Sequence, residues 1–557
     1  MTTQTSPATR NTAEMTGGEA IVRALIANGV DTLFGLPGAQ MYPFFDGLHR
    51  HSDAIRMIGA RHEQACAYMA FGYARSTGRP GVFSVVPGPG VLNTFAALAT
   101  AAGCSAPVLC VTGQVPSTFL GKGRGHLHEL PDQRASLRTV CKWAERIERI
   151  ADAPAIVDEA FRQMLSGRPG PVSIEMAWDV MAAKDEAEIL PPAVIPAAPP
   201  PSREEIARAA DLLAGANRPM LFLGSGAQGA ADEIRALCEA LGMPATAMRG
   251  GRGIMPEGSD LGLSSYAAFK LWPEVDVAIG IGTRMELPFM RWGNMMTLME
   301  APQAPPHVIR IDIDPAEMTR LRVHAPVVAD AAAGARALLE AVRERNVARK
   351  DTSYLAAVKD EATREVQSVK PHIDYLKVIR AALPDNGFFV EELCQTGFTS
   401  FFGYEVRQPR TYVSAGFQGT LGFGFMTALG VKAANPDRPV VSVAGDGGFL
   451  FGVQELATAA QFGLGVVSIV FNNNAYGNVL RDQDTRFGGR VIGAELQNPD
   501  FMTLAKAFGI AGQRVASPEE LAKVLPDAIR ANVPTLIEVT VDRATEVSPW
   551  PFIHTRR

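Results

Sequence analysis

Residues 440–477 read VVSVAGDGGFLFGVQELATAAQFGLGVVSIVFNNNAYG, and this stretch decides the fold. A run rich in β-branched residues, 440–444, ends in a glycine turn. Residues 453–462 suit a helix, and 466–471 form a second β-branched run. This order predicts a β-α-β unit of a parallel sheet, in which ligands bind beyond the carboxyl ends of the strands.

Polar residues follow both predicted strands. Asp446 lies between Gly445 and Gly447, and Asn473 follows the second strand. The two glycines allow backbone N–H groups to approach an anion closely. Asp446 and Asn473 offer oxygen ligands to Mg²⁺, which takes few protein ligands and completes its shell with phosphate oxygens. The pattern predicts a metal-bridged diphosphate site, and two unrelated polar turns are the alternative interpretation.

Length and composition set the broad class of the protein. A chain of 557 residues with 47% hydrophobic and 20% charged residues predicts a soluble globular protein of three or four domains. The net charge of −5 gives no reason to expect nucleic acid or a membrane as a partner. Six scattered cysteines without a CxxC pair favour buried thiols over disulfides or zinc. The polar N-terminus and the short apolar runs predict neither a signal peptide nor a membrane span, so a cytoplasmic enzyme is expected.

Two stretches are candidate domain boundaries. The proline-rich residues 191–201, PPAVIPAAPPP, cannot form a helix interior or a central strand. The charge-mixed residues 345–370 form a second boundary or a helix that links domains. The predicted domains are residues 15–185, 202–345 and 370–545. Each alternates short apolar runs with amphipathic stretches, which predicts an α/β fold of three doubly wound parallel-sheet domains.

The Asp446…Asn473 pattern resembles the diphosphate-binding motif of thiamine diphosphate (ThDP) enzymes. In that family the Asp, the second Asn and a backbone carbonyl two residues further on hold Mg²⁺, which implies Asp446, Asn473 and Ala475 here. The resemblance covers almost the whole chain and implies a pyrimidine-binding, a middle and a diphosphate-binding domain, in that order. Further residues expected at the cofactor are Gly38, Asn93, Gln395, Thr396, Leu421, Gly445, Gly447, Gly448, Tyr476, Gly477 and Asn478.

Residues 61–93, RHEQACAYMAFGYARSTGRPGVFSVVPGPGVLN, resemble the pyrimidine-binding domain of the acetolactate synthase group. The resemblance implies that Glu63 contacts the aminopyrimidine ring. A carboxyl group that shares its proton with a ring nitrogen in a dry pocket favours the imino tautomer, which then takes the C2 proton. A solvated glutamate in the first turn of a helix is the alternative. Gln114 and His128 are further candidate catalytic residues, because related enzymes have substrate-facing groups near these positions.

The middle segment carries a GxGxxG pattern at Gly224–Gly229. The next predicted strand ends in Met248-Arg249-Gly250 without the acid that a dinucleotide ribose requires, which disfavours NAD. In acetolactate synthases this domain binds FAD, and Gly282–Arg284 and Asp312–Asp314 resemble parts of that site. FAD is therefore a candidate cofactor, although other relatives bind an adenine nucleotide or no flavin there.

The resemblance implies a ThDP- and Mg²⁺-dependent carboligase or lyase that acts on 2-keto acids or aldehydes through an enamine. It also implies a homodimer or homotetramer with active sites between chains. A 2-keto acid decarboxylase is the first alternative, and a flavin-linked oxidase is the next. A non-catalytic ThDP-binding assembly subunit is the alternative from another class, against which the presence of Glu63, Asp446 and Asn473 together argues.

The chain departs from the acetolactate synthase pattern at several positions. Ala39 replaces a second glycine, and Leu127-His128 replaces a Phe-Gln pair. The pair Gly38-Ala39 and Gln114 look more like benzaldehyde-lyase-type carboligases, which have a histidine where this chain has Gln40. The sequence therefore indicates the cofactor much more specifically than the substrate.

Overall fold

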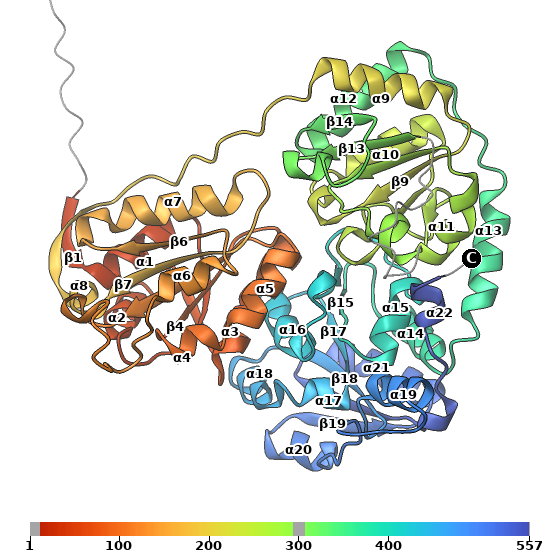
Figure 1. Ribbon diagram of the computed structural model, residues 1–557. Coiled ribbons are helices and arrows are strands. Elements are labelled where there is room, and N and C mark those ends of the chain that lie inside the picture. The colour runs from red at the N-terminus through yellow and green to blue at the C-terminus, as the bar shows by residue number, and fades with distance from the viewer. Residues whose placement is uncertain (1–11, 293–306, 556–557) are drawn as a thin grey trace, which may run out of the picture. The chain divides into compact units, whose positions relative to one another are not determined.

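The computed structural model describes residues 12–292 and 307–555 (Figure 1). Within these residues there are three six-stranded sheets, and β1 (Thr12–Thr16) pairs antiparallel with β8 (Lys184–Glu188). The chain divides between Pro196 and Ala197 into two compact units, apart from Arg75–Thr77, which group with the second unit. No helix in the described part of the chain combines the length and apolar character needed to cross a bilayer.

The N-terminal unit is built on one parallel sheet with helices on its faces (Figure 1). The strand order is β3-β2-β4-β5-β7-β6. Strands β4 and β5 are buried along their whole length, as expected for a parallel sheet that is covered on both faces. The strands are β2 (Thr32–Gly35), β3 (Arg56–Gly59), β4 (Gly81–Val85), β5 (Val108–Gln114), β6 (Trp143–Ile147) and β7 (Val172–Ala177). The helices include α1 (Gly17–Ala27), α2 (Tyr42–Arg50), α3 (Glu63–Thr77), α5 (Phe95–Gly103), α6 (Gln133–Arg138) and α7 (Ala153–Leu165).

The C-terminal sheet, in the second unit, has the order β16-β15-β17-β18-β20-β19. Counted along the chain, this is the order 2-1-3-4-6-5, which is also the order of the N-terminal sheet. The strands are β15 (Phe388–Val390), β16 (Tyr412–Val413), β17 (Val440–Gly445), β18 (Val466–Asn472), β19 (Ala511–Val515) and β20 (Thr535–Thr540). The main helices are α14 (His372–Ala382), α15 (Gln395–Gly403), α16 (Phe423–Ala434), α18 (Leu456–Phe462), α19 (Gly477–Arg486) and α21 (Pro518–Ala531). In both sheets the winding direction reverses between the first and third strands, which is where open parallel sheets bind ligands.

The middle sheet has a different order, β11-β10-β9-β12-β13-β14, or 3-2-1-4-5-6 along the chain. This is the order of dinucleotide-binding folds, so the three predicted domains share a class but not one topology. The strands are β9 (Pro219–Leu223), β10 (Ala245–Ala247), β11 (Gly262–Leu263), β12 (Val277–Ile281), β13 (His307–Asp312) and β14 (Ala325–Val328). Helices α9 (Arg203–Gly215), α10 (Ala231–Leu241), α11 (Ser265–Leu271) and α12 (Ala331–Glu344) belong to this domain. Residues 345–370 include a helix, α13 (Leu355–Val366), and the predicted domain boundary there stays a prediction.

Local structure around the deciding stretch differs in detail from the sequence expectation. The predicted glycine turn after β17 is a short helix, α17 (Asp446–Phe449). The helix expected over 453–462 begins with a 3₁₀ turn, Val453–Glu455, before α18. Gly445 has an extended backbone, with φ −80° and ψ 159°, that any residue adopts. The glycines here therefore provide room for close packing rather than an unusual backbone angle.

Candidate active site

A cavity of about 220 Å³ lies at the carboxyl ends of the C-terminal strands. Strand pairing sets its position, because Gly445 at the end of β17 lies beside Phe471 near the end of β18. The lining includes eleven of the residues that the sequence predicted at the cofactor: Gln395, Leu421, Gly445, Asp446, Gly447, Gly448, Asn473, Ala475, Tyr476, Gly477 and Asn478. The parallel sheet thus brings together residues more than 80 positions apart in the sequence, from Gln395 to Asn478.

Asp446 forms one side of this cavity and is 1% exposed. Burial raises the pKa of its carboxyl group, while backbone N–H groups of Gly447 and Ala475 and the Asn498 amide oppose that shift. Asn498 Nδ2 donates to Asp446 Oδ2 at 2.7 Å and also to Asn472 Oδ1 at 2.9 Å. A carboxylate held in a fixed position and short of solvent is a suitable ligand for a cation.

Asn473 also lines the cavity and directly follows β18. Its Oδ1 accepts a hydrogen bond from the Ala475 backbone N at 3.1 Å, and its Nδ2 donates to Glu546 Oε2 at 2.8 Å. Among residues 12–292 and 307–555, no group of three or more His, Cys, Asp and Glu side chains forms a metal site. A Mg²⁺ ion here would therefore take one carboxylate, amide and carbonyl oxygens, and oxygens from a ligand.

Three glycines that line the cavity leave room for neighbouring side chains. A Cβ at Gly447 would lie 2.4 Å from the Tyr476 ring, and one at Gly448 would lie 3.2 Å from Leu421 Cδ1. A Cβ at Gly477 would lie 2.8 Å from Asn473 Nδ2. Side chains at these positions would displace the residues that line the cavity.

The donors and the shape of the cavity fit a ligand with an anionic end and an apolar ring. Gln395 lines the cavity, and its buried Oε1 has no hydrogen-bond partner in the described part of the chain. This oxygen can only accept a hydrogen bond, so the NH₂ group of the amide is the part that can donate to an anionic group. Leu421 and Phe398 supply apolar surface. Thr396 is fully buried and is not among the residues that line the cavity. Its Oγ1 lies 2.8 Å from His372 Nδ1. Its predicted contact with the diphosphate stays a prediction.

The N-terminal unit places Glu63 at the first residue of α3. Asn93 Nδ2 donates to Glu63 Oε2 at 3.0 Å, which orients the carboxylate. A Cβ at Gly90 would lie 3.6 Å from Glu63 Oε1, so this carboxylate oxygen lies next to the turn that follows β4. Gly38 follows β2 and packs against Val86, because a Cβ there would lie 2.5 Å from Val86 Cγ1.

His128 lies on a loop of the same unit, beside Gln40. Its Nδ1 is 2.7 Å from Gln40 Oε1, and Gln40 Nε2 donates to the Leu127 backbone O at 2.9 Å. Both residues have positive φ, 67° for His128 and 68° for Gln40, a strained conformation for side chains of this size. Burial lowers the pKa of His128, and the negative charge of Glu63 opposes that shift. The charge of Glu63 therefore acts on the pKa of His128.

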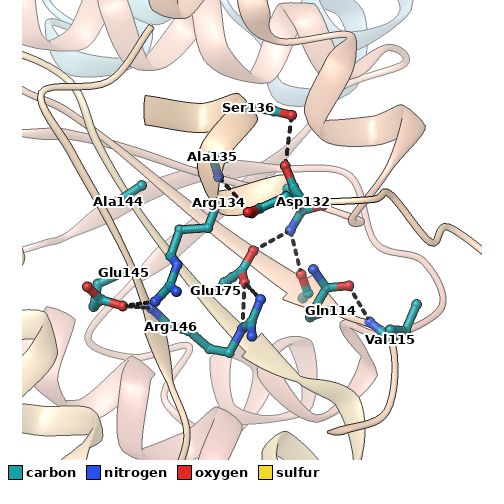
Figure 2. A network of polar contacts seen from close by, with 12 residues as sticks. Gln114, Val115, Asp132, Arg134, Ala135, Ser136, Ala144, Glu145, Arg146 and Glu175 are labelled. Carbon is teal, nitrogen blue, oxygen red and sulfur yellow. Dashed lines mark hydrogen bonds and ion pairs between the residues drawn. The ribbon is translucent and has the colours of Figure 1, made fainter. Parts of the chain in front are cut away.

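Gln114 ends β5 and is 3% exposed. Its side-chain Oε1 accepts a hydrogen bond from the Val115 backbone N at 2.8 Å (Figure 2). Part of this amide therefore has a structural role in the turn after β5. Its predicted contact with the substrate stays a prediction.

A buried polar network holds these strand ends in place (Figure 2). Gln133 accepts a hydrogen bond from the Gly88 backbone N at 2.8 Å and donates to the Gly113 backbone O at 3.0 Å. The same amide donates to Glu175 Oε2 at 2.8 Å, and Arg146 Nε donates to Glu175 Oε1 at 2.7 Å. The network joins the turn after β4, the end of β5 and strand β7.

Comparison with known proteins agrees with this geometry. Three family models match the chain: the N-terminal TPP binding domain of thiamine pyrophosphate enzymes over residues 15–136, the central domain over 206–338 and the C-terminal TPP binding domain over 394–539. A Methanocaldococcus jannaschii protein named "Probable acetolactate synthase large subunit" is 34% identical across 96% of this chain and 94% of its own length. The chain belongs to the thiamine pyrophosphate enzyme family.

Other relatives of this thiamine pyrophosphate enzyme carry two kinds of name. "Acetolactate synthase isozyme 1 large subunit" from Escherichia coli is 31% identical across 98% of the chain and 97% of its own length. "Probable 2-ketoarginine decarboxylase AruI" from Pseudomonas aeruginosa is 34% identical across 94% of the chain and 94% of its own length. The chain is thus an acetolactate synthase-like ThDP enzyme that also has a decarboxylase among its relatives.

Several residues of this enzyme's site were absent from the sequence prediction. His372, Phe398 and Glu546 line the cavity, and Asn498 holds Asp446. None of them carries a local motif, and only the folded chain places them beside Asp446 and Asn473. Gln40 was noted only as a departure from a family pattern, whereas the structure makes it the partner of His128.

Proposed function

We propose that this protein is a ThDP- and Mg²⁺-dependent carboligase or lyase for 2-keto acids or aldehydes. The observation that carries the proposal is the convergence of Asp446, Asn473 and Gln395 on one cavity at the switch point of the C-terminal sheet. The N-terminal domain supports it with Glu63, whose carboxylate is already oriented by Asn93.

Each group of the cofactor has residues to hold it. Asp446, the Asn473 Oδ1 and the Ala475 carbonyl oxygen would ligate Mg²⁺, and Gln395 would contact the diphosphate. Leu421 would supply apolar surface for the rings. ThDP supplies an acidic C2 carbon and an electron sink when it is bound. Glu63 would share a proton with the pyrimidine nitrogen, and exclusion of water from that contact would strengthen the hydrogen bond.

His128 and Gln114 are the groups proposed to face the substrate. Because burial lowers its pKa, His128 is neutral at neutral pH and can accept a proton through its second ring nitrogen. Both kinds of named relative suggest a 2-keto acid as the donor. A decarboxylase needs only protonation after loss of CO₂, whereas a carboligase must exclude that proton and admit an acceptor carbonyl. The relative named as a 2-ketoarginine decarboxylase supports the decarboxylase as the second candidate function.

A substrate panel distinguishes these functions. Wild-type protein and Glu63→Gln are incubated with ThDP, Mg²⁺ and pyruvate, glyoxylate, benzaldehyde or formaldehyde, and products are identified by mass spectrometry. We expect wild-type turnover that is lost in the variant. A 2-hydroxy ketone or 2-hydroxy-3-keto acid product supports a carboligase, and an aldehyde product supports a decarboxylase. Cofactor binding with no turnover in either protein would favour a non-catalytic subunit.

We also propose a homodimer, or a tetramer built from it, with each active site shared between two chains. Complementation tests this sharing. Glu63→Gln and Asp446→Ala should each be inactive in their own dimers, and a mixed dimer would recover one intact site. Co-refolding or co-expression should restore about a quarter of wild-type activity. Sedimentation analysis of the mixture confirms that mixed dimers form, and no recovery in their presence would contradict a shared site.

A flavin or adenine nucleotide in the middle domain is a separate proposal. Gly282–Arg284 follow β12, and Asp312–Asp314 begin at the last residue of the neighbouring parallel strand β13, so both segments lie at one edge of the sheet. Arg284 lies over the Phe417 ring at 4.0 Å, where its charge could serve a phosphate. Visible absorbance of the purified protein and mass spectrometry of heat-released small molecules test for a bound nucleotide.

A further inference from the structure

Glu546 lies 73 residues along the chain from Asn473 yet contacts its side chain. Its side chain is 8% exposed, and it follows the 3₁₀ turn Arg543–Thr545. The next residue, Val547, donates its backbone N–H to the Lys370 backbone O at 2.8 Å, which fixes this segment beside the start of α14. A nearly buried carboxylate requires hydrogen-bond partners, and the structure supplies one for each oxygen.

The first partner is Asn473. Its Nδ2 donates to Glu546 Oε2 at 2.8 Å. Glu546 Oε2 accepts this hydrogen bond, so the end of the Asn473 amide that faces it is the NH₂ group. The amide carbonyl Oδ1 then points away from Glu546, and this oxygen is the atom that a hard cation prefers.

The second partner is His372, which is fully buried at the start of α14. Its Nε2 lies 2.9 Å from Glu546 Oε1 and its Nδ1 lies 2.8 Å from Thr396 Oγ1. The ring also packs against Phe471, with centroids 6.0 Å apart. His372 thus fixes the Glu546 carboxylate, which in turn fixes the Asn473 amide.

We propose that Glu546 is a positioning residue for the metal, which sets the orientation of the Asn473 amide and is itself held by His372. This inference rests on the proposed Mg²⁺ site and adds a chain of contacts that runs from Thr396 through His372 and Glu546 to Asn473. Outer-sphere partners of this kind affect metal affinity because they determine which atom a ligand presents.

The test measures metal binding directly. Mg²⁺ is titrated by calorimetry into wild type, Glu546→Ala and Glu546→Gln, each with a fixed concentration of ThDP, and thermal unfolding is recorded without cofactor. Glu546→Ala should weaken Mg²⁺ affinity about 10- to 100-fold, with turnover recovered at saturating Mg²⁺. Glu546→Gln should bind Mg²⁺ more tightly than Glu546→Ala, because its side-chain carbonyl can still accept from Asn473.

Tyr375→Leu is the matched control. Tyr375 lies on α14, the same helix as His372. Like the His372 ring, its ring packs edge-on against Phe471, with centroids 5.3 Å apart. This variant should lower the unfolding temperature without a specific loss of Mg²⁺ affinity. Equal loss of Mg²⁺ affinity in Tyr375→Leu and Glu546→Ala would overturn the positioning role, because packing alone would then explain both.

Asp446→Ala separates the inference from the function on which it rests. If wild type binds ThDP with Mg²⁺ and Asp446→Ala does not, while Glu546→Ala binds Mg²⁺ like wild type, only the role of Glu546 is wrong. If wild type shows no Mg²⁺-dependent binding of ThDP, the proposed function fails and the inference fails with it.

Discussion

Asn93 donates a hydrogen bond from its Nδ2 to Glu63 Oε2 across 3.0 Å, so the proposed catalytic carboxylate is oriented by a side chain 30 residues away. This contact joins the helical turn after β4 to the first residue of α3. Asn93 was expected from the sequence only as a cofactor contact. The structure gives it a second role, as the partner of Glu63.

Replacement of Asn93 by Ala should leave the fold intact and reduce activity. Without this donor the Glu63 carboxylate gains rotational freedom, and a lost contact of about 1.4 kcal/mol in the transition state lowers kcat/KM about tenfold. Steady-state kinetics with saturating ThDP measure the effect. An unchanged kcat/KM would show that the orientation of Glu63 does not depend on Asn93.

The acid side of the pH profile should depend on Gln40. Burial lowers the pKa of His128 below its ordinary 6.5, so wild-type kcat/KM should stay level as the pH falls through 6.5 and decline only at lower pH. A negative charge at residue 40 stabilises the protonated ring. Gln40→Glu should therefore move the acid limb up by about one pH unit, measured from kcat/KM between about pH 5 and 8. Gln40→Leu, which adds no charge, is the control, and equal profiles for all three proteins would exclude His128 from the reaction.

Gln133→Leu should destabilise the N-terminal domain. The substitution leaves the Gly88 N–H, the Gly113 carbonyl and one Glu175 oxygen without their partner in a buried site. Each unsatisfied buried group costs about 1 to 3 kcal/mol. Thermal unfolding measures the loss, with Ser136→Ala as the control, because Ser136 is a half-buried residue of the same helix whose hydroxyl donates to the Asp132 backbone O. A midpoint like that of wild type would mean that water or another side chain satisfies these groups.

Glu391 should make stability dependent on pH. It is 1% exposed, and burial raises its pKa from 4.5 to about 7. The folded state therefore keeps a proton that the unfolded chain releases above 4.5, and the stabilisation linked to that proton is present below 4.5 and is lost as the pH rises through 7. Glu391→Gln removes this dependence. Wild type should therefore lose stability relative to the variant between pH 5 and pH 8. The unfolding midpoint of the variant minus that of wild type should increase by at least about 2 °C over this range.

Removal of the metal should act through Asp446. Chelation of Mg²⁺ should abolish ThDP binding by wild type, and Asp446→Ala should reproduce that loss even when Mg²⁺ is present. Calorimetry with ThDP measures both. ThDP affinity that is unchanged in Asp446→Ala would contradict the metal assignment.

The sequence by itself determined the class of fold and one edge of the site. β-branched runs followed by glycine and polar residues predict parallel strands, and the carboxyl ends of neighbouring parallel strands lie together at one edge of the sheet. That rule brings Asp446 and Asn473 together without knowledge of any other part of the chain. The strand order could not be predicted in the same way, because the alternation of strands and helices is alike in all three domains whereas the middle sheet is wound differently.

Only the tertiary structure decided which side chains orient the site. Glu546 reaches His372 across 174 residues, and His128 reaches Gln40 across 88. A hydrogen bond between distant residues depends on which loops the sheet brings to the same edge and on how each backbone turns there. Periodicity and local motifs describe only residues close together in the sequence, so they cannot predict these contacts.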